Sequence, residues 1–118
     1  MSRSVLLQLA RDSIEEVFQA QSTINKNELL QTYPLLQEKI KTNINLYING
    51  EIKGSYTNKT AENSLLANII IGAKKAAFED TNRATLTTSE YLHCELEIIL
   101  FTSQGNLKER DSAIIKSN

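Results

Sequence analysis

His93 and Cys94 are the side chains best suited to act as a base and a nucleophile, and each is the only residue of its type in the chain. The segment from His93 to Thr102 alternates polar and apolar residues, which predicts a β-strand with Cys94 on its apolar face. Successive side chains of a strand point to opposite faces, so His93 and Cys94 cannot form a catalytic pair within one chain. We therefore expect Cys94 to be a small core residue.

The polar face of the same strand would carry His93, Glu95 and Glu97 in a row. Successive side chains on one face are about 7 Å apart, given the rise of a strand. Such a row could form a shallow metal or acid–base site on the surface. The simpler interpretation, which we favour, is the ordinary polar face of a half-buried strand.

The composition favours no resident metal, cofactor or assembled catalytic group. A zinc site needs three or four His, Cys or carboxylate ligands, and the chain has one His and one Cys. Its four glycines do not form a phosphate-binding or dinucleotide-binding pattern, and no serine lies in a nucleophile-elbow pattern. Whether the chain is an enzyme stays open, and the sequence favours a non-enzymatic role.

The segment from Lys53 to Thr60 is the strongest candidate for binding a ligand. It carries two lysines and several hydroxyl groups directly before a helix that we expect to begin near Thr60. Free backbone N–H groups at the start of a helix favour anions such as phosphate or carboxylate. The alternative is a strand that runs into a helix cap, with its lysines in water. The candidate ligand-binding residues are Lys53, Gly54, Ser55, Thr57, Lys59 and Thr60.

The elements that position these residues follow from hydrophobic periodicity. A first helix should run from a cap at Ser2 or Ser4 to about Gln19, with Arg11 and its charged neighbours on the solvent side. Residues 21–28 suggest a loop, and Pro34 argues against one continuous helix in the segment that follows.

A β-hairpin is expected next. Ile44, Leu46 and Ile48 alternate with polar residues, and Asn49-Gly50 is the strongest short signal for a tight turn. The return strand would place Ile52 inward. Gly54 would mark a bulge or a close approach of the backbone to another element.

A second helix should run from near Thr60 to about Glu79. A capping box at residues 87–90 precedes the strand from His93 to Thr102. The predicted fold class is therefore α+β: an antiparallel sheet with a β-hairpin, covered on one face by two helices, in the order α-β-β-α-β. Residues 1–106 would form one domain. Residues 107–118 would form a tail whose structure, as strand, helix or disorder, stays open.

The net charge, the start of the chain and the single cysteine indicate which partners and which cell compartment to expect. Thirteen Lys and Arg nearly balance fourteen Asp and Glu, for a formal net charge of −1, which argues against nucleic-acid binding. The start of the chain lacks the pattern of a signal peptide, and no apolar run is long enough for a membrane helix. With a single cysteine, the sequence predicts a cytoplasmic protein without an intrachain disulfide.

Most of the chain resembles the AMMECR domain, whose bacterial and archaeal members are called protein A of the AmmeMemoRadiSam system. The first helix is similar to that of the family. The other matching segments are Asn49-Gly50-Glu51-Ile52-Lys53-Gly54, Ala76-Ala77-Phe78-Glu79-Asp80, Leu86-Thr87-Thr88-Ser89-Glu90-Tyr91-Leu92 and Cys94-Glu95-Leu96-Glu97-Ile98. The resemblance implies an α+β fold and a role beside a radical-SAM enzyme and a Memo-like protein.

The chain departs from the family at its Arg-Gly-Cys-Ile-Gly motif. Only Gly54 is kept, with Lys53 in the place of the arginine and Ser55 in the place of the cysteine. Lysine does not reproduce the two-pronged binding of arginine, and serine is a weaker nucleophile than cysteine without a base. Asp80 and a displaced Arg83 replace the family's Asp-Pro-Arg-Phe, and the resemblance implies a shortened domain.

These observations predict a divergent AMMECR-like binding domain. We expect it to act through a protein partner or by self-association as a homodimer, because the scaffold is kept while the motif is not. The alternative function is the binding of a small molecule or anion, or an enzymatic reaction, at the loop from Lys53 to Thr60.

Overall fold

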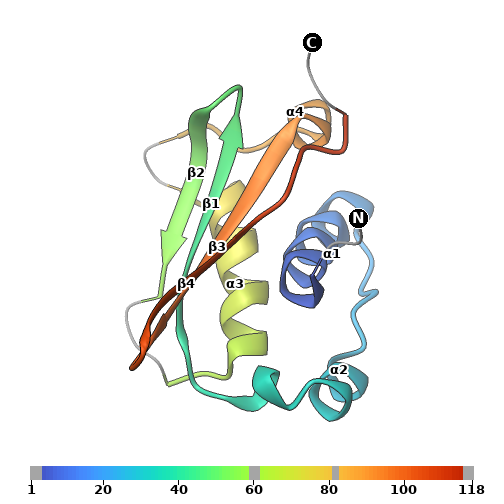
Figure 1. Cartoon of the computed structure of the whole chain (residues 1–118). Helices are drawn as coiled ribbons and strands as arrows, with labels where there is room; N and C mark the ends of the chain where they lie inside the picture. The colour runs from blue at the N-terminus through green and yellow to red at the C-terminus, as the bar shows by residue number, and fades with distance from the viewer. Residues whose placement is uncertain (1–3, 59–61, 81–82, 116–118) are drawn as a thin grey trace.

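The structure of the chain is a computed structural model that describes residues 4–58, 62–80 and 83–115. Four antiparallel strands form one sheet in the order β2-β1-β3-β4, and helices α1 and α3 lie side by side on one of its faces (Figure 1). This confirms the predicted α+β class. In chain order the elements are α1 (Val5–Gln19), α2 (Lys26–Thr32), the 3₁₀ helix η1 (Pro34–Gln37), β1 (Lys41–Ile48), β2 (Glu51–Thr57), α3 (Leu65–Phe78), α4 (Thr88–Leu92), β3 (Cys94–Thr102) and β4 (Gly105–Arg110).

The turn between β1 and β2 is confirmed. Asn49 and Gly50 both have positive φ, at 52° and 81°, as a type I′ turn requires. The return strand differs from its expected alternation because a bulge shifts the register between Leu46 and Tyr47. The two-residue turn pairs Ile48 with Glu51 and Tyr47 with Ile52, so Ile52 lies on the face away from the helices and is 42% exposed. The inward prediction for Ile52 was wrong because its partner across the turn, Tyr47, is an outward residue of β1. The bulge follows Ile52, at Lys53, and sets Gly54 inward and Ser55 outward.

Gly54 marks a close approach of two backbones, as its sequence position suggested. A Cβ atom added to Gly54 would lie 1.9 Å from the carbonyl oxygen of Ala76 in α3. No side chain fits at that separation, so the glycine allows β2 to lie directly against the last turns of the helix. This contact fixes which part of α3 lies beside the strand.

Helix α3 begins later than the sequence suggested. Its N-cap is Ser64, whose hydroxyl accepts a hydrogen bond from the backbone N–H of Ala67 at 3.2 Å. The described residues just before it, 62–64, are not helical, so the expected start near Thr60 was wrong. The backbone N–H of Leu65 binds the carbonyl of Glu38 instead, which anchors the first turn of the helix to the segment after η1.

Helix α1 begins at the predicted cap, Ser4, but Arg11 is not on its solvent side. Arg11 is fully buried, and its guanidinium donates to the carbonyl of Cys94 at 2.8 Å and to both carboxylate oxygens of Asp111 at 2.9 and 3.1 Å. Burial alone would lower the pKa of Arg11, and the hydrogen bond and charge of Asp111 outweigh it and raise the pKa. A buried charge is stable only when paired in this way.

Proline and polar caps divide the segment after α1. Asn25 caps α2, which starts at Lys26, so the expected loop ends earlier than residue 28. Pro34 stands at the first position of η1 and separates it from α2, which confirms that no continuous helix passes through this proline.

The last third of the chain completes the sheet. Thr87 and Glu90 form both hydrogen bonds of the predicted capping box. The strand that follows starts at Cys94, with His93 as the C-cap of α4. The open question about the tail resolves as a strand over residues 107–110, which belong to β4.

The core lies between the sheet and the two long helices. The inward residues of β1 and β3, including Ile44, Leu46, Leu96 and Ile98, are fully buried. Figure 1 shows α1 and α3 on this side, and Tyr91 of α4 packs against Phe18 of α1. In the part of the chain that the structure describes, no helix is long and apolar enough to cross a membrane.

Candidate functional site

The face of the sheet that points away from α1 and α3, here called the outer face, gathers most of the polar side chains of the strands. It consists of the odd-numbered residues of β1 and β3, the even-numbered residues of β4, and Ile52, Ser55 and Thr57 of β2, as the pairing of the strands requires. None of the helices in residues 4–58, 62–80 and 83–115 packs over it (Figure 1).

A chain of hydrogen bonds crosses the outer face from β2 to β3. The hydroxyl of Ser55 donates to the side-chain oxygen of Asn45 at 2.6 Å. The side-chain amide of Asn45 donates to Glu97 at 2.9 Å, and the hydroxyl of Tyr47 donates to the same carboxylate oxygen at 3.1 Å. Asn43 joins the network because its side-chain oxygen accepts from the amide of Asn45 at 2.6 Å, and its own amide donates to the hydroxyl of Thr57 at 2.8 Å. Three strands therefore hold one ordered set of polar groups.

Glu97 is the centre of this network and is only 4% exposed although none of the described helices covers it. Arg110 lies beside it, with a guanidinium nitrogen 3.9 Å from Glu97 and another 2.7 Å from Glu95. The same guanidinium lies over the ring of Tyr47 at 4.3 Å. Desolvation, together with the hydrogen bond to Glu97, raises the pKa of Tyr47, and the hydrogen bond to Glu95 raises the pKa of Arg110.

Ser55 is not arranged as a nucleophile. Its hydroxyl donates to an amide oxygen, which is not a base that could accept a proton in a reaction. Its backbone N–H donates to the carboxylate of Asp80 at 3.0 Å, and Arg83 pairs with the same carboxylate oxygen at 2.9 Å. The described neighbours of Ser55 therefore hold it in place and do not activate it.

The other predicted ligand-binding residues lie in different surroundings. Lys53 is at the bulge of β2, where its ammonium pairs with Glu90 at 3.0 Å, and Gly54 packs on α3. Thr57 ends the strand on the outer face, while Lys59 and Thr60 lie outside the described residues.

The first residues of this segment lie near the carboxyl end of α3, away from its start. Gly54 contacts the carbonyl of Ala76, near the carboxyl end of α3, where the helix dipole is negative. The amino end of α3 begins at Leu65. The start of α3 is therefore not beside Gly54, and the part of the predicted loop nearest to it in sequence, Lys59 and Thr60, lies outside the described residues.

The row of His93, Glu95 and Glu97 is only partly assembled. Glu95 and Glu97 share the outer face and both lie within 4 Å of Arg110. His93 caps the end of α4, and its Nδ1 lies 3.1 Å from the carbonyl oxygen of Ile115. Among the residues that the structure describes, no group of three His, Cys, Asp or Glu side chains could hold a metal ion.

Cys94 lies in the core, as expected, and has no exposed surface. Burial raises the pKa of its thiol to about 11, so at neutral pH the group is protonated. The thiol is therefore not a nucleophile in the folded chain.

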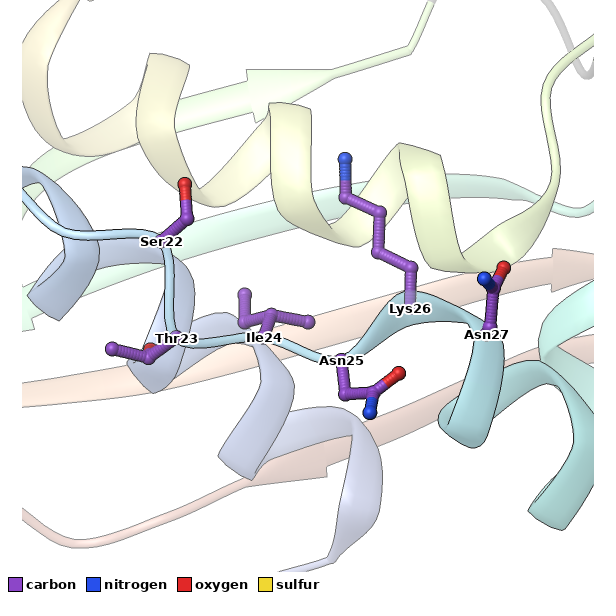
Figure 2. A pocket seen from close by; sticks show the side chains of 6 residues that line it. All are labelled: Ser22, Thr23, Ile24, Asn25, Lys26 and Asn27. Carbon is purple, nitrogen blue, oxygen red and sulfur yellow. The ribbon is translucent and has the colours of Figure 1, made fainter.

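A separate shallow hollow of about 500 Å³ lies at the loop between α1 and α2. Figure 2 shows its six lining residues, with Ser22, Lys26 and Asn27 extending to one side of the loop and Asn25 to the other. The hollow is open, and its lining contains no His, Cys, Asp or Glu side chain. Sequence reasoning did not single out this loop, and its geometry carries no chemistry of its own.

Sequence reasoning also missed Asn45, Tyr47 and Arg110 as members of the polar network. A signal was present for Asn45, because Asn43 and Asn45 alternate with the apolar Ile44 and Leu46. Arg110 had no such signal, since it stands in the segment whose structure was left open. Strand pairing alone brings it beside Glu95.

Comparison with known proteins places this geometry in a family. The crystal structure of the uncharacterized protein PH0010 from Pyrococcus horikoshii matches with a TM-score of 0.73 and 24% sequence identity, over 82% of this chain and 49% of that chain. At this identity the likeness shows the fold, and the chain spans about half the length of that protein. No curated protein matches the chain. The AMMECR1 family model matches residues 7–117, in agreement with the resemblance seen in the motifs, and the chain therefore belongs to the AMMECR1 family.

Proposed function

We propose that this chain is a non-enzymatic binding domain that docks a second polypeptide on the outer face of its sheet. The observation that carries the proposal is the ordered network of Ser55, Asn45 and Glu97 on a face that no described helix covers. Polar groups held in fixed positions on an open surface bind a partner with little further loss of conformational freedom.

Apolar side chains lie on the outer face beside the polar network and also support the docking of a polypeptide there. Ile52 is 42% exposed and lies beside Tyr47, and Ile99 and Phe101 are half-buried on the same face. A mixed surface of aromatic, aliphatic and fixed polar groups is typical of protein interfaces whose partners also exist alone. We expect this binding to take place in the cytoplasm, as the sequence predicts.

An enzymatic role has less support from the arrangement of the side chains. Ser55 at the family's cysteine position has an amide oxygen as its hydrogen-bond acceptor. The thiol of Cys94 is buried and protonated. Neither group is presented to a substrate in a reactive state.

The test compares two exposed isoleucines. Ile52→Glu places a charge on the outer face, whereas Ile71→Glu makes the same change on α3, where the isoleucine is 39% exposed. The tagged chain and both variants are isolated gently from their own cells and weighed by native mass spectrometry. A co-purifying polypeptide is then made separately, and its affinity for each purified variant is measured.

The proposal is supported if a second copy or another polypeptide binds the wild-type chain, and if this binding is lost in Ile52→Glu and kept in Ile71→Glu. A chain that stays monomeric and alone contradicts it. A stoichiometric adduct of metabolite mass, with no polypeptide, also contradicts it and favours the alternative of a small-molecule site.

A further inference from the structure

The two edges of the sheet differ in how far they are covered. The strand order places β2 at one edge and β4 at the other. At the β2 edge, Asp80 accepts the backbone N–H of Ser55, and Lys53 pairs with Glu90 across the bulge. A bulge and a bound carboxylate prevent another strand from pairing there. The β4 edge is the one that could accept a strand.

The register of β4 determines which backbone groups face outward. The N–H of Asp111 donates to the carbonyl of Leu96 in β3 at 3.0 Å. Because backbone groups alternate along an antiparallel strand, those of Asn106, Lys108 and Arg110 point away from β3. Among the described residues, no hydrogen bond reaches these outward N–H groups. They form the unpaired row that a further strand requires.

The side chains of β4 define what such a strand should carry. On the outer face, Lys108 and Arg110 have side chains that are 62% and 43% exposed, and each lies near a carboxylate of β3 on one flank only. On the opposite face, Leu107 is 58% exposed, and the half-buried Glu109 accepts a hydrogen bond from the hydroxyl of Ser4 at 2.8 Å. A neighbouring strand would therefore meet cations on one face, and on the other an apolar side chain beside a carboxylate that α1 already binds.

A second copy of β4 matches this edge less well. If two β4 strands paired antiparallel in one continuous sheet, outer-face residues would stand opposite outer-face residues. In the registers that set Lys108 opposite Lys108 or Arg110, like charges would lie directly opposite each other and destabilise the pair. In the register that sets Lys108 opposite Asn106, the second β4 supplies no acidic side chain to the outer face. A strand of opposite charge is the better match to this edge.

We infer that the β4 edge binds an extended segment of a partner protein in which acidic residues alternate with apolar ones. The acidic side chains lie beside Lys108 and Arg110, an apolar side chain contacts Leu107, and the backbone extends the sheet by one strand. This inference rests on the proposed function, since it names the partner class of an interaction domain and the part of the sheet that it contacts.

The test uses a short synthetic peptide in which aspartate and valine alternate, and a matched peptide with lysine in place of aspartate. Lys108→Pro removes one outward N–H and one charge without breaking the ladder to β3, because proline is tolerated at such edge positions. Lys108→Glu reverses the charge and keeps the N–H. Lys26→Glu makes the same charge change at the first residue of α2. Circular dichroism confirms that each variant is folded.

We expect the aspartate peptide to bind the wild-type chain and the lysine peptide to bind much more weakly. Affinity for the aspartate peptide should fall roughly tenfold in Lys108→Glu and at least as far in Lys108→Pro, with no change in Lys26→Glu. In NMR spectra, adding the aspartate peptide should change the backbone chemical shifts of the residues of β4. Equal binding of the two peptides, unchanged affinity in both Lys108 variants, or shifts confined to β2 would overturn the inference.

The two proposals fail separately. One outcome is a polypeptide partner whose binding is lost in Ile52→Glu but is unchanged in Lys108→Pro. That outcome overturns the edge inference and still supports the proposed function. Binding of the aspartate peptide along β4, without any polypeptide that depends on Ile52, supports the edge inference and contradicts docking on the rest of the outer face.

Discussion

Arg11 and Asp111 stand 100 positions apart in the sequence and form a buried ion pair with two hydrogen bonds, of 2.9 and 3.1 Å. Arg11 belongs to α1, and Asp111 follows directly after β4. The arginine has no exposed surface and the carboxylate side chain is 10% exposed. This pair joins the first helix to the end of the last strand, so the two ends of the domain depend on each other.

Asp111→Ala should be strongly destabilising, because it leaves the guanidinium of Arg11 buried without its counter-charge. We expect a loss of about 3 kcal/mol or more in the free energy of unfolding, measured by urea denaturation. The control is Glu79→Ala, which removes an exposed partner of Lys75 at 3.6 Å and should change the free energy by about 0.5 kcal/mol or less. Equal effects of the two substitutions would show that the buried pair has no special role.

Gly54→Ala should destabilise the contact between β2 and α3. The new methyl group would lie 1.9 Å from the carbonyl oxygen of Ala76, and backbone cannot move aside as easily as a side chain. We expect a loss of roughly 1–3 kcal/mol in unfolding free energy.

The matched control for that substitution is Gly72→Ala in the middle of α3. There the new methyl group meets the end of the Ile44 side chain at 3.0 Å. Alanine also favours a helix by about 1 kcal/mol over glycine. The two effects oppose each other, so the net change should stay within about 1 kcal/mol. A Gly54→Ala variant as stable as Gly72→Ala would contradict the close approach.

The cap of α4 should make stability sensitive to acid. Hydrogen bonding to the backbone N–H of Thr87, followed by the interaction with Lys53, lowers the pKa of Glu90 below its ordinary value of 4.5. Because the pKa of Glu90 is lower in the folded state, the ionised carboxylate stabilises the fold at pH values above 4.5. This contribution is lost as the pH falls from 4.5 through the pKa of the folded state. Glu90→Gln should therefore lose less stability than the wild type over that acidic range.

Melting temperature as a function of pH provides the measurement for Glu90→Gln. Glu51→Gln makes the same change of charge at the turn end of β2, so the difference between the two variants isolates the cap. If the melting temperature of Glu90→Gln falls with acid as steeply as that of the wild type, the ionised Glu90 does not stabilise the cap of α4.

The thiol of Cys94 should resist chemical modification in the folded chain. It is fully buried and burial raises its pKa to about 11, so both access and thiolate are lacking at neutral pH. A thiol-specific reagent should react only as fast as the chain unfolds, and the rate should rise with urea. Rapid stoichiometric reaction without denaturant would mean that the strand opens locally at Cys94.

Local patterns in the sequence were sufficient for several elements of the fold. Asn49-Gly50 gives the hairpin because both residues tolerate positive φ, and Thr87 with Glu90 gives the start of α4 through two short-range hydrogen bonds. The inward alternation of β1 and β3, with Cys94 in the core, follows from the period of a strand. These features depend on residues close together in the chain.

The candidate site could be predicted only in part, for the same physical reason. Ser55 was singled out from the sequence, but as a member of a loop before a helix. Its place on β2 beside Asn45, and the extension to Glu97, depend on the pairing of three strands. Hydrogen bonds across a sheet join residues that no local periodicity relates to one another.

The sequence by itself determined the α+β class, the hairpin, the caps of α1 and α4 and the apolar face of each central strand, because these follow from local backbone preference and from the period of hydrophobic burial. Tertiary structure decided that a bulge turns Ser55 outward beside Asn45, that Arg11 is buried beside Asp111, and that β4 forms one edge of the sheet. Those outcomes depend on which distant segments meet, where the free energy of burial and pairing exceeds the local preference of each residue.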